Sequence, residues 1–125
     1  MAQKDTASIA VAAAQPAAES WLLLVDQRRY GESWDSAAVL FRGAVSKVGW
    51  EKAVLQARGP FEPFGARKLL SATFATTLPN APPGRYVVLR YGTRVTGNRR
   101  VVETVTPMKD ADGTWRVSGY FIGQQ

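Results

Sequence analysis

The side chains that most often carry catalysis are missing from this chain, which has 125 residues and contains no cysteine and no histidine. Without thiols there is no disulfide, thiolate zinc site or thiol nucleophile. Without imidazoles the commonest general base and metal ligand are also missing. Asp110 and Asp112, just before Gly113, are typical of a hairpin turn, because the later carboxylate of a calcium loop does not follow. The sequence therefore predicts no metal and no cofactor, and it favours a non-enzymatic role.

A second group of residues has the types that are enriched in protein interfaces, namely arginine, tyrosine and aliphatic residues. Its members are Tyr86, Arg90, Arg94, Glu103, Val105, Arg116 and Tyr120. If these residues share one exposed face of a sheet, that face requires a cover. A second copy in a homodimer, another protein or the N-terminal segment could supply it. Alternatively, arginine side chains lie over the valines of a monomer. A nucleic-acid partner is disfavoured, because Glu103 lies within the group and no recognition motif is present.

A third group consists of aromatic residues that could line a pocket between helices and sheet. Its members are Trp34, Trp50, Tyr91 and Trp115. The group suggests a site for a small apolar ligand, or an isomerase-like enzyme that uses Tyr91. Ordinary core packing is the simpler interpretation, since aromatic residues dominate cores of this size.

The N-terminal half has the apolar spacing of helices. Residues 1–14 are predicted to be a flexible leader, and residues 15–125 a single domain. The first helix is expected from about Pro16 to Arg29. Ser33 or Asp35 can cap a short second helix with an apolar face of Ala38, Phe41 and Ala44. Ser46 can cap a third, and Gly59-Pro60 ends it. Its candidate buried residues are Val48, Trp50 and Leu55.

In the C-terminal half, apolar and polar residues alternate with the two-residue period of strands. The strands are expected at residues 68–78, 85–95, 99–109 and 114–122. In the first of them, Leu70, Ala72 and Phe74 should share one side. A two-residue turn at Gly97-Asn98 and a four-residue turn at 110–113 should connect the last three strands.

These turns predict a register in which Thr96 faces Arg99 and Lys109 faces Thr114. Cross-strand partners point the same way, so the register defines two faces. The face expected to pack on the helices has Val87, Leu89, Tyr91, Val102, Met108, Trp115, Val117 and Phe121. The opposite face has Tyr86, Val88, Arg90, Arg94, Val101, Glu103, Val105, Arg116, Ser118 and Tyr120. A one-residue bulge in either hairpin would exchange these faces.

The net charge of +6 is unevenly distributed. Residues 1–63 carry seven basic and seven acidic residues, whereas residues 64–125 carry nine basic and three acidic ones. This excess provides solubility or favours an anionic partner. No apolar run approaches the ~18 residues of a membrane span, and no intact signal peptide is recognised at the N-terminus.

Several segments together resemble the bacterial domain-of-unknown-function family numbered 4019. They are Ala18–Leu22, Ser33–Asp35, Phe41-Arg42, Leu70–Ala72, Tyr86–Leu89, Val102–Met108 and Trp115–Tyr120, with Tyr30 and Trp50. The match covers about residues 17–122, and residues 102–107 are its most specific part. Members are typically small proteins with an export signal, so the resemblance implies a periplasmic or secreted protein. The family has no established activity and therefore assigns no catalytic residue.

The broader layout resembles the cystatin-like and nuclear-transport-factor-2-like folds. We therefore expect an α+β domain in which N-terminal helices pack on a curved four-stranded antiparallel sheet. These folds host enzymes, binding proteins and dimerisation modules, so the fold leaves the function open. The sequence favours a module that self-associates or binds a partner through the outer sheet face. A small-molecule-binding domain with the aromatic pocket is the alternative.

Overall fold

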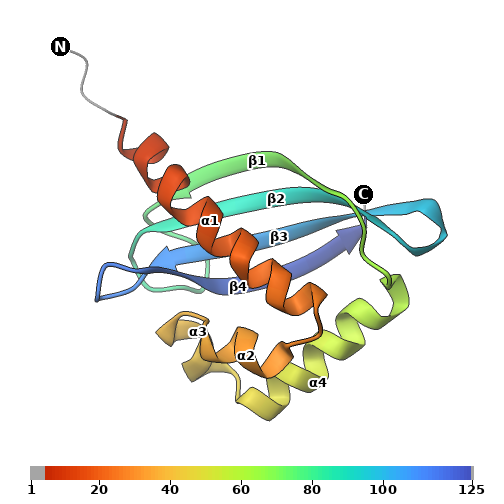
Figure 1. Cartoon of the computed structure of the whole chain (residues 1–125). Helices are drawn as coiled ribbons and strands as arrows, with labels where there is room; N and C mark the ends of the chain where they lie inside the picture. The colour runs from red at the N-terminus through yellow and green to blue at the C-terminus, as the bar shows by residue number, and fades with distance from the viewer. Residues whose placement is uncertain (1–4, 125) are drawn as a thin grey trace.

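Helices come first along the chain and strands second, as the sequence predicts. The computed structural model describes residues 5–124 and confirms an α+β arrangement (Figure 1). The helices are α1 (Thr6–Asp26), α2 (Tyr30–Asp35), α3 (Val39–Ala44), α4 (Lys47–Arg58) and the short 3-10 turn η1 (Gly59–Phe61). The strands are β1 (Arg67–Ala75), β2 (Tyr86–Val95), β3 (Arg99–Lys109) and β4 (Trp115–Gln124), with the 3-10 turn η2 (Thr96–Asn98) between β2 and β3.

Helix α1 begins earlier than the sequence predicts. The side chain of Asp5 accepts a hydrogen bond from the backbone N–H of Ala7 at 3.1 Å and caps the helix. Residues 6–14, which the sequence analysis placed in a flexible leader, therefore belong to α1, and Ala10 and Ala14 among them are buried. Residues 1–4 of that leader lie outside the described residues. The buried side of α1 is formed by small and large apolar residues at helical spacing, namely Ala10, Ala14, Ala18, Trp21, Leu22 and Val25.

The length and apolar character of α1 would suffice to span a membrane, with a mean hydropathy of 1.3 in its most apolar part. The sequence analysis expected no uninterrupted apolar run of this length, and polar residues such as Gln15 and Glu19 do interrupt α1. A helix inside a protein core meets the same threshold, and six residues of α1 are buried in this core.

Three short helices lie beside the β4 edge of the sheet (Figure 1). Residues 30–35 form a helix of their own, α2, and Ser33 is buried within it instead of capping the next helix. Ser46 caps α4 as predicted, because its Oγ accepts from the N–H of Gly49. Trp50 is buried as predicted.

Two other predicted core residues of α4 are not buried. Val48 is 59% exposed and Leu55 is 51% exposed, whereas Val54 occupies the core.

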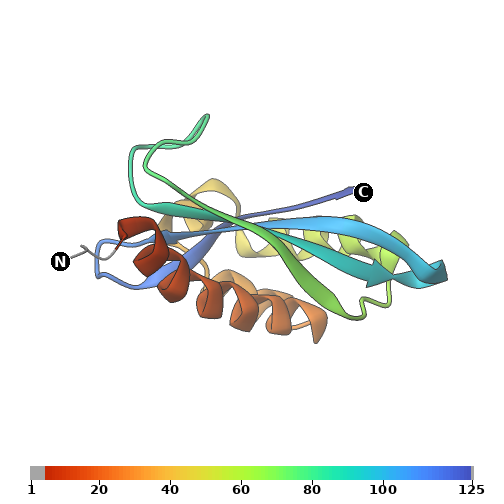
Figure 2. The ribbon, with the colours of Figure 1, turned by 90° about the horizontal axis from the view of Figure 1, so that it is seen from above.

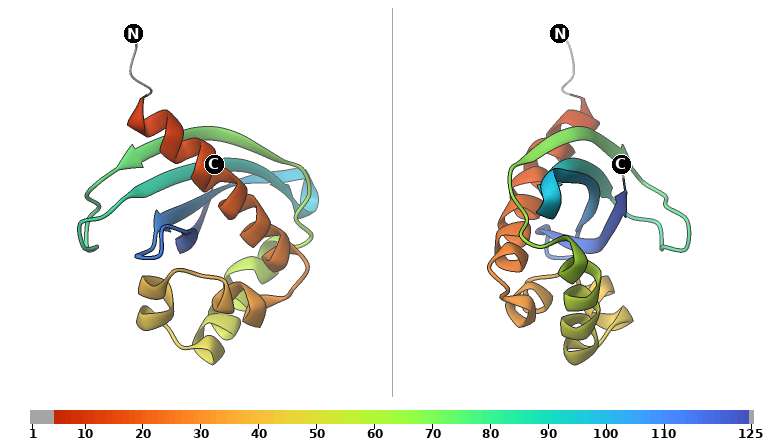
Figure 3. Two further views of the ribbon diagram at one scale, coloured as in Figure 1. Left: turned by 60° about the vertical axis from the view of Figure 1, so that its left-hand side comes forward. Right: turned by 90° about the vertical axis from the view of Figure 1, so that its right-hand side faces the viewer.

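The four strands are hydrogen-bonded in the order β1-β2-β3-β4, and every neighbouring pair is antiparallel. The sheet is curved, and α1 crosses one of its faces (Figures 2 and 3). At the edge of the sheet, the N–H of Ala38 donates to the carbonyl of Val117 at 2.8 Å and ties α3 to β4. One side of the sheet thus packs on the helices. We call the side away from α1 the outer face.

The predicted register is wrong by one residue in the β2–β3 hairpin, and in the β3–β4 hairpin by one residue near the turn and by two beyond Thr106. Turn η2 contains three residues, so Val95 faces Arg99. Gly97 and Asn98 both have positive φ angles, 69° and 58°, which glycine and asparagine adopt at low cost. In the second hairpin the turn contains five residues, and Lys109 faces Trp115.

Because side chains alternate along a strand, this shift moves several of them to the other face. Glu103 faces Tyr91, and Val105 faces Leu89 and Tyr120, on the helix side. The residues predicted outside but found on the helix side are Val101, Glu103, Val105 and Tyr120. Those predicted inside but found on the outer face are Val102, Met108 and Phe121. The predicted core positions Val87, Leu89, Tyr91, Trp115 and Val117 are confirmed.

Two irregularities refine the faces further. The register of β1 shifts between Leu69 and Ser71, so Leu69 packs against the core and Leu70 is 46% exposed. The β3–β4 register shifts between Thr106 and Pro107, which pair with Gly119 and Val117. Bulges of this kind add one unpaired residue and increase the local twist.

The register can be tested by thiol labelling, because the chain contains no cysteine. In a Phe121→Cys variant the thiol should react almost as fast as a free thiol, since Phe121 is 67% exposed. In a Val105→Cys variant it should react on the order of 100-fold more slowly, because labelling must wait for local opening. The register predicted from the sequence would give the reverse order.

Candidate functional site

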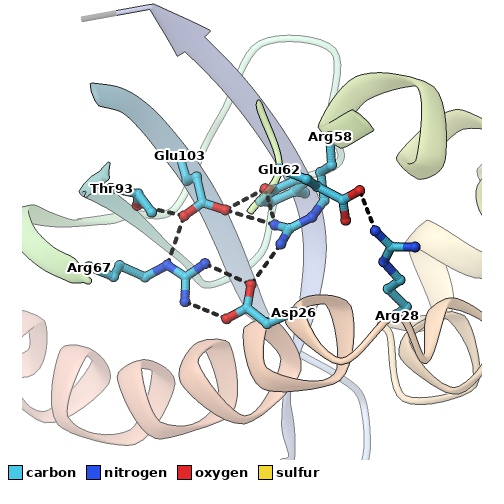
Figure 4. Close-up of polar contacts among 8 residues, drawn as sticks. Asp26, Arg28, Arg58, Glu62, Arg67, Thr93 and Glu103 are labelled. Carbon is cyan, nitrogen blue, oxygen red and sulfur yellow. Dashed lines mark hydrogen bonds and ion pairs between the residues drawn. The ribbon is translucent and has the colours of Figure 1, made fainter. Parts of the chain in front are cut away.

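The glutamate that the sequence predicts on an exposed face is fully buried. Glu103 has no exposed side-chain surface, and both of its carboxylate oxygens accept hydrogen bonds (Figure 4). Oε1 accepts from Thr93 Oγ1 at 2.6 Å and from Arg67 Nε at 2.7 Å. Oε2 accepts from Arg58 Nη1 at 3.1 Å and from the hydroxyl of Tyr120. Donors from four different elements therefore converge on one carboxylate.

Asp26, the last residue of α1, extends this cluster toward the surface. It accepts from Arg58 Nη2 at 2.7 Å and from Arg67 Nη1 at 2.9 Å. Two carboxylates thus bind two guanidiniums, and Arg58 is only 1% exposed. The guanidinium of Arg58 also lies over the ring of Phe64, 3.6 Å from its centroid. We call these residues the charge cluster: Asp26, Arg58, Arg67, Thr93, Glu103 and Tyr120.

The protonation states in the charge cluster follow from burial and neighbouring charge. Burial opposes ionisation of Asp26, but the hydrogen bonds and charges of Arg67 and Arg58 outweigh it and lower the pKa of this carboxyl. Burial and the charge of Glu103 raise the pKa of Tyr120, so its phenol stays protonated and donates. The oxygens of Glu103 are already engaged by four donors. The cluster is therefore built to hold elements together, and it presents no free general base.

The four aromatic residues of the predicted pocket are not gathered around one cavity. Trp50 packs edge-on against Phe41 at 4.9 Å, and its indole N–H donates to Ser33 Oγ. The indole N–H of Trp34 donates to the carbonyl of Val45. The hydroxyl of Tyr91 donates to Glu19 on α1 at 3.2 Å. These contacts correspond to core packing, the simpler of the two interpretations.

Trp115 is the member of this group that lines surface hollows. It contributes to one hollow beside Trp21 and to another beneath the N-terminal turns of α1.

The predicted partner-binding residues are likewise divided between several places. Glu103, Val105 and Tyr120 lie on the helix side, as described above. Tyr86 is on the outer side but is 1% exposed, and its hydroxyl donates to the carbonyl of Pro82 at 2.7 Å. Arg116 is paired with two aspartates of the β3–β4 turn. Arg90 and Arg94 are exposed, as expected.

The outer face instead gathers cations that the sequence analysis did not group together. Arg94 lies directly opposite Arg100 on the neighbouring strand. Arg90 lies four residues from Arg94 along β2, and Lys68 on β1 pairs with Gly92 between them. Both side chains are exposed on the same side of the sheet as Arg94. Among residues 5–124, none of these four cations forms an ion pair with a carboxylate. We call Lys68, Arg90, Arg94 and Arg100 the cationic patch.

The carboxylates of the second half of the chain are all engaged elsewhere. Glu103 lies in the charge cluster. Asp110 and Asp112 are bound by Arg116 at 3.0 and 2.9 Å. The hydrogen bonds of Arg116 lower the pKa of Asp112, which stays ionised. The charge excess of residues 64–125 therefore appears on the surface without internal compensation.

The other end of the outer face is apolar. A groove of about 390 Å³ lies between α3, the β1–β2 loop and the sheet. Its walls include Leu40, Phe41, Val45, Leu78, Pro79 and Ala81, and no charged residue lines it. Phe121 stands between the groove and the cationic patch, next to Gly119, which lines the groove. The ring of Phe121 lies over Gly123, where an added Cβ would come within 3.3 Å of it.

Sequence analysis missed Lys68, Arg100 and Phe121 as members of this surface, and it placed Phe121 in the core. The charge imbalance between the two halves of the chain was a signal for the cations. No comparable signal existed for Phe121, because its face depends on the turn length. Within residues 5–124, no group of three metal-ligating side chains comes together.

The fold and this surface define a small α+β domain with one helix-covered sheet face and one open face that is apolar at one end and cationic at the other. The chain belongs to the family described as "Protein of unknown function (DUF4019)", which it matches over residues 17–120. This match confirms the family resemblance. No protein with a curated description matches the chain. The likeness to cystatin-like and nuclear-transport-factor-2-like folds stays a prediction.

Removal of Glu103 should destabilise the protein strongly. In a Glu103→Ala variant the guanidiniums of Arg58 and Arg67 lose a buried partner, and the free energy of unfolding should fall by about 3–5 kcal/mol. The matched control is Glu62→Ala, which breaks an ion pair with Arg28 that is 65% exposed on the arginine side and should cost under about 1 kcal/mol. Urea unfolding measures both. Equal losses would contradict the structural role of the charge cluster.

The low pKa of Asp26 predicts a specific acid sensitivity. Its pKa is lower in the folded than in the unfolded chain, where it is about 3.9. The stabilisation is therefore complete above that value and is lost as the pH falls through the folded pKa. In an Asp26→Asn variant, the urea midpoint should decline less between neutral and acidic pH than it does in the wild type. Parallel declines would show that Asp26 does not contribute.

Proposed function

We propose that the protein is a non-enzymatic interaction module that binds an acidic partner through the outer face of its sheet. One observation carries this proposal: four exposed cations lie on that face beside an exposed aromatic ring, and no described carboxylate pairs with them. The proposal keeps the interaction surface expected from the sequence but replaces most of its residues.

The position of Arg94 opposite Arg100 supports an anionic partner. Like charges directly across two strands destabilise a sheet, and the side chain of Asn98 gives Arg94 only a neutral acceptor at 2.6 Å. A partner carboxylate at this point would remove the repulsion and form charge-assisted hydrogen bonds with two guanidiniums. The repulsion between the two guanidiniums in the free protein would thus be replaced by attraction to the carboxylate in the complex.

The same charges make a different protein a better partner than a second copy of this chain. A homodimer through the outer face would bring two cationic patches toward each other unless the copies were staggered. Complementary potentials favour association, and like-charge contacts can cost several kcal/mol. The homodimer considered in the sequence analysis is thus the less favoured form, and its detection is one outcome of the test below.

The shape of the surface suggests what the partner looks like. Thr106 lines the apolar groove, and Arg100 lies six residues away on the same strand and on the same side. The two positions are about 20 Å apart, because a strand rises roughly 3.4 Å per residue. A fitting partner segment is extended, inserts an apolar side chain between α3 and the β1–β2 loop, and carries carboxylates toward the cationic patch.

An exported location forms part of the same proposal. It rests on the family, whose members are typically small proteins with an export signal. In the periplasm or outside the cell, an acidic protein segment is a more accessible partner than nucleic acid. Among residues 5–124, Phe121 is the one exposed aromatic residue of the outer face, which gives less support for nucleic acid than a row of stacking rings would.

A labelled peptide tests this function directly. The probe is an extended peptide with leucines at one end and glutamates about six residues away, matched to the strand spacing. Fluorescence anisotropy should show binding that weakens as salt is raised. Arg94→Glu should reduce the affinity roughly tenfold, equivalent to about 1.4 kcal/mol. The matched control Lys52→Glu changes the net charge equally at an exposed site on α4 and should leave affinity unchanged.

Three results would contradict the proposal. One is equal affinity for a peptide in which lysines replace the glutamates. Another is an equal loss with Lys52→Glu, which would indicate nonspecific attraction by the net charge. The third is tighter binding of a single-stranded oligonucleotide at the same patch. Sedimentation of the free protein completes the test, because a dimer that Arg94→Glu dissociates would replace the acidic partner with a second copy.

A further inference from the structure

A second hollow lies at the other end of the molecule, between the first turns of α1 and the end of the sheet. It encloses about 430 Å³, which is within the range of small-molecule sites. Its lining comes from α1, from the end of β1, from the residue just before β2 and from both sides of the β3–β4 turn. The residues are Thr6, Ile9, Ala10, Ala13, Phe74, Arg85, Lys109, Gly113 and Trp115.

The hollow exists because α1 presents small side chains where it crosses this end of the sheet. Ala10 and Ala13 face the space, whereas larger residues of α1 such as Trp21 fill the core further along the helix. Phe74 and Trp115 form the apolar walls on the sheet side, and both are only partly buried. Ile9, 51% exposed, stands at the rim. The walls of the hollow are thus aromatic and aliphatic groups, whose exposure to water is unfavourable.

Two cations complete the lining. The backbone N–H of Lys109 donates to the carbonyl of Arg85 at 3.0 Å, so the two side chains leave adjacent strand ends. Within the described part of the chain, neither is paired with a carboxylate. The nearby acids have other partners: Asp5 caps α1, and Asp110 and Asp112 bind Arg116.

From this combination we infer that the hollow binds an anionic amphiphile, a molecule with a negatively charged head on an apolar body. The head lies between Arg85 and Lys109, where an arginine and an ammonium provide several donors to carboxylate or phosphate oxygens. The apolar body covers Phe74, Trp115 and the alanines of α1. A neutral apolar ligand would leave the two cations without a partner.

This site is independent of the proposed interaction surface. It shares no residue with the cationic patch or with the apolar groove. It also differs from the aromatic pocket expected from the sequence, with which it shares only Trp115. Failure of either proposal therefore leaves the other intact.

Decanoate is a suitable first probe, because it combines a carboxylate with a short apolar chain. Isothermal titration calorimetry should show saturable binding to the wild type and at least tenfold weaker binding of decanol. Lys109→Gln should remove most of the preference for decanoate over decanol. Equal affinities for decanoate and decanol, or an unchanged preference in Lys109→Gln, would overturn the inference.

Reducing the volume of the hollow tests whether decanoate binds inside it or at nonspecific places on the surface. Ala13→Leu should fill part of the hollow and weaken decanoate binding at least tenfold. Ala12→Leu is the matched control, because Ala12 is exposed on the same helix and does not line the hollow. Circular dichroism confirms that both variants fold. Equal binding by both variants would overturn the site.

A third experiment determines whether the anionic head group belongs to a free amphiphile or to a lipid surface. Vesicles of phosphatidylglycerol present the same chemistry as part of a lipid surface. If decanoate binds and the vesicles do not, the ligand class is a free amphiphile. If both bind and Ala13→Leu weakens both, the hollow takes a lipid headgroup with part of its chain. Vesicle binding without decanoate binding would overturn the hollow in favour of a surface attachment.

Discussion

A single buried carboxylate fixes how the helices sit on the sheet. Glu103 on β3 accepts hydrogen bonds from α4, β1, β2 and β4 through Arg58, Arg67, Thr93 and Tyr120. Burying a carboxylate costs several kcal/mol unless its oxygens are all satisfied. If a helix shifted, Glu103 would lose a donor, and the free-energy cost of burying its carboxylate would no longer be offset. Asp26 adds the end of α1 to the same set. The charge cluster thus disfavours other placements of α1 and α4 on the sheet.

The charge cluster also explains the surface. The C-terminal half has three acidic residues, and the fold uses one inside and two in the β3–β4 turn. Apart from Arg67 and Arg116, the basic residues of that half form no ion pair with a described carboxylate, and they lie on the outer face and at the strand ends. Two of them, Arg85 and Lys109, stand beside apolar walls. Two others, Arg94 and Arg100, face each other on the open sheet. Neither pair has a carboxylate partner among the described residues, and this shared feature supports the two anionic ligands proposed above.

Much of the fold follows from the sequence, and the errors have physical causes. Helix order, strand order, the Ser46 cap and the family were predictable from periodicity, capping and the recognisable segments. The start of α1 was missed because its buried residues there are alanines, which give a weak periodic signal. The faces of β3 were exchanged because Val101, Val102 and Val105 place aliphatic side chains on both sides, so alternation alone does not define a core face. The predicted faces depended on a two-residue turn at Gly97-Asn98, and Glu103 on the open face did not contradict that turn, since a lone glutamate is normally exposed.

The turn between β2 and β3 connects the interior to the surface. With two residues in this turn, Glu103 would point outward among arginines and neutralise them, and Asp26 alone would remain as a carboxylate partner for Arg58 and Arg67. The third residue of the turn is accommodated by the positive φ angles of Gly97 and Asn98. It shifts the register by one residue, so every side chain of β3 lies on the opposite face of the sheet. It places Glu103 among its donors and Arg100 opposite Arg94 in one step. The buried charge cluster and the cationic patch therefore arise from one structural choice, and a variant that altered this turn would change core and surface together.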